Sequence, residues 1–125
     1  GLNLGIAFQI KDDILDIFGK KEFGKKIGKD IEERKLGNIV TLFSLKELPS
    51  KDKNKILRII RKEKIKDSDI EEALQLIKKT NSGEKAYQLG EKYIKRAKEN
   101  LKILPRNKWN NILSEMADFV MRRKK

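Results

Sequence analysis

Three carboxylates lie close together in an otherwise apolar stretch of the sequence, at Asp12, Asp13 and Asp16. In a helix, Asp12 and Asp16 are one turn apart on the same face, and Asp13 lies about 100° round from Asp12. Like charges at this spacing cost a bare helix about 0.2–0.5 kcal/mol, and more among apolar neighbours. A hard divalent cation would offset that cost, and Mg²⁺ suits one or two carboxylates with substrate phosphates. The alternative is an acidic surface patch, or carboxylates paired with Lys11 and Lys20.

A single helix over residues 2–18 is expected to carry these aspartates, because apolar residues recur throughout the stretch and it has no proline. Gln9 lies one turn before Asp12 and Asp13, so its amide belongs to the same neighbourhood. No Ser, Thr or Asp precedes Leu2 as a helix cap. We therefore expect this helix to be the interior part of a longer protein.

A glycine- and lysine-rich loop is expected next, over residues 19–30. Glycines allow left-handed backbone and close approach, and lysines supply point charges that suit phosphate. Beside a metal-binding helix, this combination favours a diphosphate site, in which the metal bridges phosphate oxygens and lysines neutralise the leaving group. A solvated basic turn is the alternative.

The two stretches together, FQIKDDILDIFG at residues 8–19 and FGKKIGKDI at residues 23–31, closely resemble the trans-isoprenyl diphosphate synthases, or polyprenyl synthetases. The three aspartates match the second aspartate-rich motif of that family. Matches also occur on either side of it, at the preceding Phe-Gln pair and at the following GKxxGxD loop: Phe8, Gln9, Gly24, Lys25, Gly28 and Asp30. Several ordered matches at fixed spacing make the resemblance specific.

The resemblance implies a chemistry and a role for each matching residue. Enzymes of this family couple an allylic diphosphate to isopentenyl diphosphate, with Mg²⁺ held between two aspartate-rich helices. Asp12 and Asp16 would bind the metal, and Asp13 would belong to the same metal site or pair with a lysine. Catalysis or charge stabilisation would fall to Gln9, Lys25 and Lys35. Diphosphate binding would fall to Lys25, Lys35 and Arg123, and Phe8 would line the pocket.

The sequence departs from the family pattern just after the loop. The family usually continues DIxEGKxT, whereas this chain reads Asp30-Ile31-Glu32-Glu33-Arg34-Lys35-Leu36-Gly37. Arg34 replaces a glycine and Gly37 stands where Thr or Ser is common. The local backbone decides whether Lys35 reaches a diphosphate or is an ordinary exposed lysine.

The rest of the chain has helical periodicity and no segment of period two, so we expect an all-α fold. Helices are expected, in chain order, over residues 38–48, over residues 51–62, from residue 67 to the break at 81–83, over residues 84–104, and from residue 109 onward. Ser50 is expected to cap the second of these, Asp30 to cap a turn after the loop, and Ser68 with Glu71 to form a capping box. Residues 1–125 would be one segment, comprising helix 2–18, basic loop 19–30 and helical remainder 31–125. By the resemblance, they are the C-terminal helices of an isoprenoid synthase-type bundle.

Composition restricts the remaining options. The chain has net charge +12, no cysteine and no histidine, which excludes disulfides, thiol chemistry and histidine-based zinc sites. It contains no apolar run long enough for a transmembrane segment and no signal peptide, so a cytoplasmic location is expected. The basic residues are spread along the chain and only 6% of residues are aromatic, which argues against a nucleic-acid partner.

The family's first aspartate-rich motif has no counterpart in these residues. We therefore expect the N-terminal part of the synthase, or a second subunit, to supply it within a homo- or hetero-oligomer. This chain alone would then be inactive, because one acidic helix cannot hold a diphosphate from both sides. The alternative is a non-catalytic regulatory or structural subunit of such a synthase.

Overall fold

The computed structural model describes residues 2–19, 27–102, 114–116 and 118–119. Its named helices are α1 (Leu2–Phe18), α2 (Lys29–Glu32), α3 (Ile39–Glu47), α4 (Ser50–Arg61), α5 (Asp67–Lys78) and α6 (Ser82–Lys102), and residues 114–116 and 118–119 are also helical. The described residues include no strand, so the predicted all-α fold is confirmed. The helix predicted from residue 109 lies largely outside the described residues.

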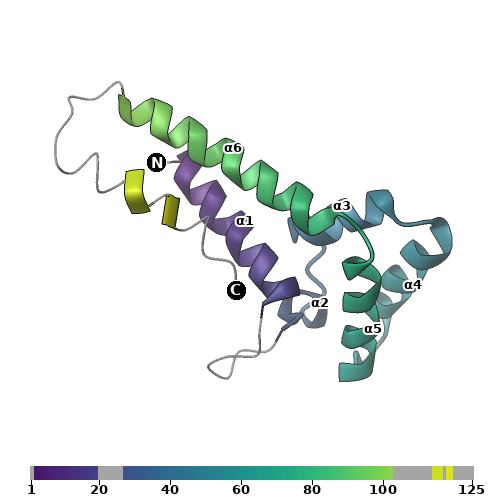
Figure 1. The fold of residues 1–125 in the computed structure, drawn as a ribbon. Coiled ribbons are helices and arrows are strands. Elements are labelled where there is room, and N and C mark those ends of the chain that lie inside the picture. The colour runs from purple at the N-terminus through teal and green to yellow at the C-terminus, as the bar shows by residue number, and fades with distance from the viewer. Residues whose placement is uncertain (1, 20–26, 103–113, 117, 120–125) are drawn as a thin grey trace.

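The two long helices form one side of the molecule. α1 and α6 lie side by side and run in opposite directions, while α3, α4 and α5 gather around the C-terminal end of α1 and the start of α6 (Figure 1). The short helix α2 lies near α5 at the same end. The turn of α1 that carries the aspartates is therefore held where several helices meet.

Branched aliphatic side chains make up most of the core. Ile17, Ile31, Ile56 and Ile77 are at most 1% exposed and come from α1, α2, α4 and α5. Together with residues of α3 they form one continuous cluster. A smaller cluster around Ala7 and Ile94 joins the other ends of α1 and α6. The apolar stripes that the sequence shows at helical spacing are thus core faces.

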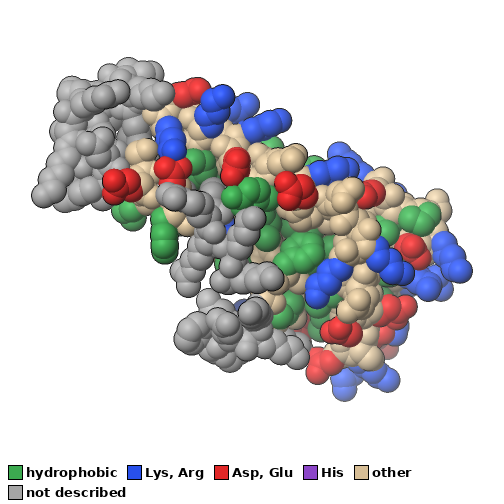
Figure 2. Space-filling model, viewed as in Figure 1, with side chains coloured by type: hydrophobic (Ala, Val, Ile, Leu, Met, Phe, Trp, Pro, Cys, Tyr) green, Lys and Arg blue, Asp and Glu red, His purple; other side chains and the backbone are tan. Residues whose placement is uncertain are grey.

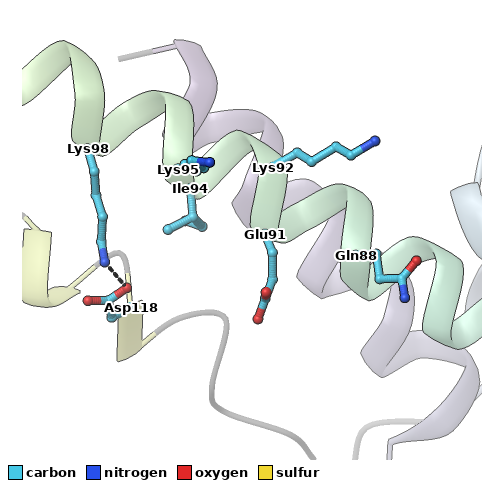
Figure 3. Close-up of a pocket in the computed structure, with 7 residues that line it drawn as sticks. All are labelled: Gln88, Glu91, Lys92, Ile94, Lys95, Lys98 and Asp118. Carbon is cyan, nitrogen blue, oxygen red and sulfur yellow. Dashed lines mark ion pairs between the residues drawn. The ribbon is translucent and has the colours of Figure 1, made fainter.

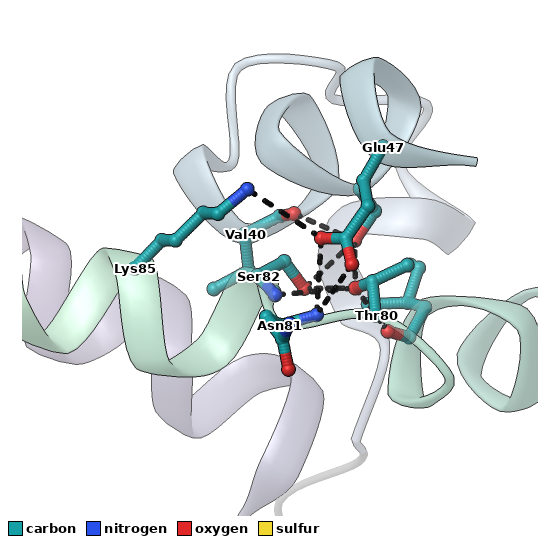
Figure 4. Close-up of polar contacts among 8 residues, drawn as sticks. Val40, Glu47, Thr80, Asn81, Ser82 and Lys85 are labelled. Atoms are coloured by element: carbon teal, nitrogen blue, oxygen red, sulfur yellow. Dashed lines mark hydrogen bonds and ion pairs between the residues drawn. The ribbon is translucent and has the colours of Figure 1, made fainter.

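Buried hydroxyl groups join α3 to the start of α6 (Figure 4). The hydroxyl oxygens of Ser44, Thr80 and Ser82 lie 2.7–3.3 Å from one another, and Ser44 and Ser82 are fully buried. Beside them the Glu47 carboxylate accepts the backbone N–H of Asn81 at 3.0 Å. Since buried polar groups must be hydrogen-bonded, this cluster fixes α6 relative to α3.

The start of α6 also packs closely against α1. A Cβ added at Gly83 would lie 2.7 Å from Cε2 of Phe18. Glycine at this position therefore lets the aromatic ring of Phe18 approach the backbone of α6. A helix break is expected from the sequence at residues 81–83, but α6 already begins at Ser82.

Helix caps differ from the sequence expectations at three places. Ser50 is the first residue of α4 and Pro49 is its N-cap, without a side-chain hydrogen bond. Helix α2 begins after Gly28, so Asp30 lies inside it. At α5, the carboxylate that reaches back to the chain before the helix belongs to Asp69, which accepts the backbone N–H of Lys66 at 3.0 Å. Helices α2 and α4 therefore begin earlier than their expected caps imply, whereas α5 begins at Asp67 as predicted and has Lys66 as its N-cap.

Asp69 is expected to make the stability of the protein depend on pH in the acid range. Its buried carboxylate also accepts a hydrogen bond from Lys62 Nζ at 2.6 Å, and this bond, with the Lys66 amide, holds the pKa of Asp69 below its ordinary value. A lowered folded-state pKa stabilises the protein above the unfolded value of about 3.9 and loses that contribution as pH falls. We expect Asp69→Asn to lower the free energy of unfolding at pH 7 and to flatten its decline between pH 5 and 3. Denaturant unfolding at several pH values measures this, and parallel curves for the two proteins would contradict it.

Charged side chains cover much of the visible surface, with lysines and arginines most evident around α4 and α5 (Figure 2). Among the described residues, no helix combines the length and apolar character required to cross a membrane.

Candidate metal and diphosphate site

The three aspartates of α1 differ in their surroundings. Asp13 is 7% exposed, and its two carboxylate oxygens accept hydrogen bonds from Gln9 Nε2 at 3.0 Å and from the backbone N–H of Ile39 at 2.9 Å. Ile39 is the first residue of α3. The Asp13 side chain therefore connects the acidic helix to the start of α3.

Asp16 makes the corresponding connection to α2. Its carboxylate accepts the backbone N–H groups of Lys29 at 3.1 Å and Asp30 at 3.2 Å, and its carbonyl accepts the N–H of Gly28 at 2.8 Å. The first N–H groups of a helix lack partners within that helix, so an acidic side chain satisfies them and complements the helix dipole. Asp16 thus performs the capping role that the sequence assigned to Asp30.

Gly28 makes this arrangement sterically feasible. Its φ is +80°, in the left-handed region, and a Cβ at this position would lie 2.6 Å from Cγ2 of Ile70. Glycine adopts such a backbone without steric cost. The match to the family's loop glycine thus has a local explanation in both backbone conformation and packing against α5.

Asp12 differs from the other two aspartates. It is exposed and makes no hydrogen bond or ion pair with any residue that the structure describes. Phe8, one turn earlier, is 42% exposed. This face of α1 offers a hard oxygen ligand beside apolar surface.

Burial raises the pKa of Asp13 and of Asp16, the two aspartates that accept backbone hydrogen bonds. Desolvation is the largest effect on Asp13 and Asp16, and the neighbouring Asp30 carboxylate raises both values further. Hydrogen bonds from Ile39 and Gln9 to Asp13, and from Asp30 and Lys29 to Asp16, act in the opposite direction. A nearby cation would favour the charged forms of these carboxylates.

Asn38 is a residue at this site that the sequence analysis treated only as the start of a helix. Its side-chain amide donates to the Asp13 carbonyl at 3.1 Å and to Asp30 Oδ2 at 2.9 Å. Its Oδ1 accepts the N–H groups of Val40 at 2.9 Å and Thr41 at 3.4 Å, which caps α3. An asparagine directly before an apolar helical run is an N-cap signal, and that signal could have identified it.

Lys35 lies on the surface, with 63% of its side chain exposed, and its Nζ pairs with Glu33 at 2.8 Å. That hydrogen bond raises the pKa of Lys35, and the more distant carboxylates of Asp30 and Asp16 raise it further. The lysine therefore lies within the electrostatic field of the acidic site, while its direct ion-pair partner is Glu33.

Arg34 takes the backbone conformation that the family's glycine would suit. Its φ is +62°, and its guanidinium donates to the carbonyls of Ile60 and Glu63 at the end of α4, the second at 3.0 Å. A cation at a helix C-terminus is favourable. Arg34 thus adopts a left-handed backbone of the kind that suits glycine and adds a link to the end of α4.

Three of the sequence-predicted residues, Gly24, Lys25 and Arg123, lie outside the described residues, so their predicted roles stay predictions. No cluster of three or more acidic, histidine or cysteine side chains with metal-binding geometry occurs in the described part of the chain. The donor chemistry still fits Mg²⁺, which commonly takes one or two carboxylates and completes its shell with water and substrate phosphates. Asp12 supplies one such carboxylate.

Two surface hollows among the described residues lie away from the aspartates. One of about 800 Å³ runs beside α6 (Figure 3), bounded by Gln88, Glu91, Lys92, Ile94, Lys95, Lys98 and Asp118, with a 2.5 Å ion pair between Lys98 and Asp118. Another, of about 360 Å³, lies between α1 and the start of α6 and includes Lys11 and Phe18. Neither is lined by a sequence-predicted metal or diphosphate residue.

Comparison with known proteins shows the family to which the chain belongs. A sequence model of the polyprenyl synthetase family matches residues 1–77. The chain is 41% identical over 128 residues to a geranylgeranyl diphosphate synthase of Saccharolobus solfataricus, covering 100% of this chain and 38% of that protein. It is 40% identical over 76 residues to a short chain isoprenyl diphosphate synthase of Methanocaldococcus jannaschii, covering 60% of this chain and 23% of that protein.

Solved structures show the same similarity. The geranylgeranyl pyrophosphate synthetase of Pyrococcus horikoshii matches with a TM-score of 0.81 and 39% identity, over 98% of this chain and 37% of that one. A polyprenyl synthase of Caulobacter crescentus matches with a TM-score of 0.88 and 32% identity, over 100% of this chain and 38% of that one. The fold and the acidic helix are those of a helical isoprenoid synthase. The chain belongs to the polyprenyl synthetase family, and it spans well under half the length of these relatives.

Proposed function

We propose that this chain is the C-terminal segment of a prenyltransferase that condenses isopentenyl diphosphate with an allylic diphosphate in a Mg²⁺-dependent reaction. The observation that carries the proposal is the exposed Asp12 carboxylate, on a helix whose other two aspartates are fixed by backbone amides, in a chain of the polyprenyl synthetase family. The assembled protein, meaning this chain with the segment or subunit that supplies the first aspartate-rich motif, would be the active species and would be oligomeric.

Each residue of the site has a proposed part. Asp12 would hold Mg²⁺, and Asp13 and Asp16 would fix the turn that carries it while adding negative charge nearby. Mg²⁺ would supply neutralisation of the diphosphate as it leaves. Lys25, Lys35 and Arg123 would bind the diphosphate oxygens, since ammonium and guanidinium groups pair well with phosphate.

The other two predicted residues would act on the hydrocarbon. Gln9 donates its Nε2 hydrogen to Asp13, which fixes its amide, and the amide oxygen suits a developing positive charge on the allylic group. Phe8 is exposed one turn before Asp12 and would line the pocket for the isoprenoid chain. Support for this site also comes from the Caulobacter crescentus relative, whose structure is a complex with calcium and isoprenyl diphosphate.

The direct test is prenyl transfer by the assembled protein. Radiolabelled isopentenyl diphosphate is incubated with allylic diphosphates of several lengths, and labelled product is extracted. We expect product only with Mg²⁺ present and none after chelation, because the leaving diphosphate needs charge neutralisation. Absence of product with every allylic diphosphate, at saturating Mg²⁺, would refute the enzymatic proposal.

A regulatory or structural subunit is the second candidate, and it is favoured by the incomplete site: the described residues hold one acidic helix and no complete metal cluster. In that case the chain would associate with a complete synthase and alter its rate or product. An activity assay of the separated partner distinguishes the two, because the partner of a regulatory subunit is active without it, whereas a partner that supplies only the first aspartate-rich motif is not.

A further inference from the structure

Asn38 is the residue that joins the acidic turn of α1 to both helices that follow it. It is 3% exposed. Both N–H bonds of its amide and its carbonyl oxygen are used, toward α1, α2 and α3 respectively. An asparagine side chain offers two donors and one strong acceptor, so every part of this group has a partner.

The contacts of Asn38 act on the residue next to Asp12. Asn38 holds the Asp13 backbone carbonyl at 3.1 Å, and the following residue, Ile39, holds the Asp13 carboxylate at 2.9 Å. Two bonds to one residue, at its main chain and its side chain, restrict both rotation and sliding of α1 against α3. The direction in which Asp12 projects from α1 is thereby fixed as well.

Asn38 also ties the acidic turn to α2. Its second N–H donates to Asp30 Oδ2 at 2.9 Å, and the Asp30 backbone N–H in turn donates to the Asp16 carboxylate at 3.2 Å. A closed set of contacts thus runs through Asp13, Asn38, Asp30 and Asp16. Replacing the amide with a group that has fewer donors opens this set without touching Asp12.

We propose that Asn38 is a positioning residue that sets the orientation of the Asp12 carboxylate through Asp13 and Asp30. This inference rests on the proposed function where it concerns metal binding, and on the contacts alone where it concerns the geometry of α1. Residues that orient a metal ligand change metal affinity or activity by about 10–100-fold when replaced.

The test uses Asn38→Ser, because serine is a comparable helix cap but has one donor in place of two and a shorter reach. In the assembled protein, Mn²⁺ binding in the presence of inorganic pyrophosphate is measured by electron paramagnetic resonance. We expect the Mn²⁺ dissociation constant and the Mg²⁺ concentration for half-maximal prenyl transfer to rise about 10-fold or more. Hydrogen exchange of peptides covering residues 9–16 and 27–39 should accelerate, since the bonds between these segments are lost.

Ser44→Ala is the matched control. Ser44 is another buried polar residue of α3, but its hydroxyl contacts those of Thr80 and Ser82 at the start of α6. Its loss should destabilise the protein and speed exchange around residues 40–47 and 80–85, with metal affinity unchanged. Equal effects of both variants on Mn²⁺ binding, or wild-type Mn²⁺ binding and exchange in Asn38→Ser, would overturn the proposal.

Two further measurements allow the proposal to be tested if the first variant does not fold or the protein shows no activity. If Asn38→Ser does not fold, Asn38→Thr is used, because it keeps a capping hydroxyl with a single donor and adds no charge, and the same results are expected of it. If the wild-type protein shows no prenyl transfer, the proposed function fails, while the exchange measurement still decides whether Asn38 positions the acidic turn.

Discussion

Asp12→Asn in the assembled protein is expected to lower the turnover number about 10²–10³-fold while leaving the fold intact. Asp12 is the one aspartate of α1 that has no partner among the described residues. Removing its charge should therefore weaken metal binding without breaking a contact within the protein. A metal that stabilises a leaving diphosphate contributes several kcal/mol to the transition state, and each 1.36 kcal/mol corresponds to about tenfold in rate. Steady-state kinetics over a Mg²⁺ titration measures the effect.

Stability measurements separate this role from a structural one. The free energy of unfolding should change by less than about 0.5 kcal/mol, as for other exposed positions. Asp52→Asn makes the same chemical change on α4, outside the site, and should leave turnover unaffected. Turnover of Asp12→Asn close to that of the wild type would show that Asp12 is not a metal ligand.

The aspartate motif illustrates what spacing alone can predict. From the sequence, Asp12, Asp13 and Asp16 are equivalent members of one acidic face. Their different surroundings depend on residues 13 to 26 positions away, namely Lys29, Asp30 and Ile39. Helical periodicity describes which residues share a face, but it contains no information about which backbone amides of other helices meet that face.

The fold was predictable because local signals agree with tertiary packing. Apolar stripes at helical spacing and Pro49 delimit the expected helices, and α3, α4 and α5 lie within a few residues of the expected ranges. The helix starts were less accurate. At α2 and α5 the capping carboxylates come from Asp16 and Asp69, because a distant or internal acid can satisfy the first amides as well as a preceding one.

The departure at Arg34 shows why a family pattern cannot be applied by residue type alone. A glycine is common there because the backbone is left-handed, and a bulky residue at positive φ is disfavoured. Arg34 accepts that conformation and gains hydrogen bonds to two carbonyls at the end of α4. The compensation depends on α4 lying nearby, which the local sequence does not reveal.

Gly28→Ala is expected to lower the free energy of unfolding by about 2–5 kcal/mol. Left-handed backbone costs a residue with a Cβ about 1–2 kcal/mol, and forcing a methyl group into packed space costs about 1–3 kcal/mol more. The new Cβ would lie 2.6 Å from Cγ2 of Ile70, with Leu74 behind it. Denaturant unfolding of the assembled protein gives the value.

Gly37→Ala provides the matched control, because a Cβ at Gly37 meets nothing within 4 Å and its φ is not positive. It should leave stability unchanged or raise it by up to about 1 kcal/mol through the unfolded chain. A double-mutant cycle of Gly28→Ala with Ile70→Ala then separates the two costs, since removing the Ile70 side chain relieves the collision but not the backbone strain. A coupling of about 1–3 kcal/mol is expected. Similar stabilities for Gly28→Ala and Gly37→Ala would mean that the loop glycine is not required by the contact between α2 and α5, and that Asp16 alone holds the start of α2.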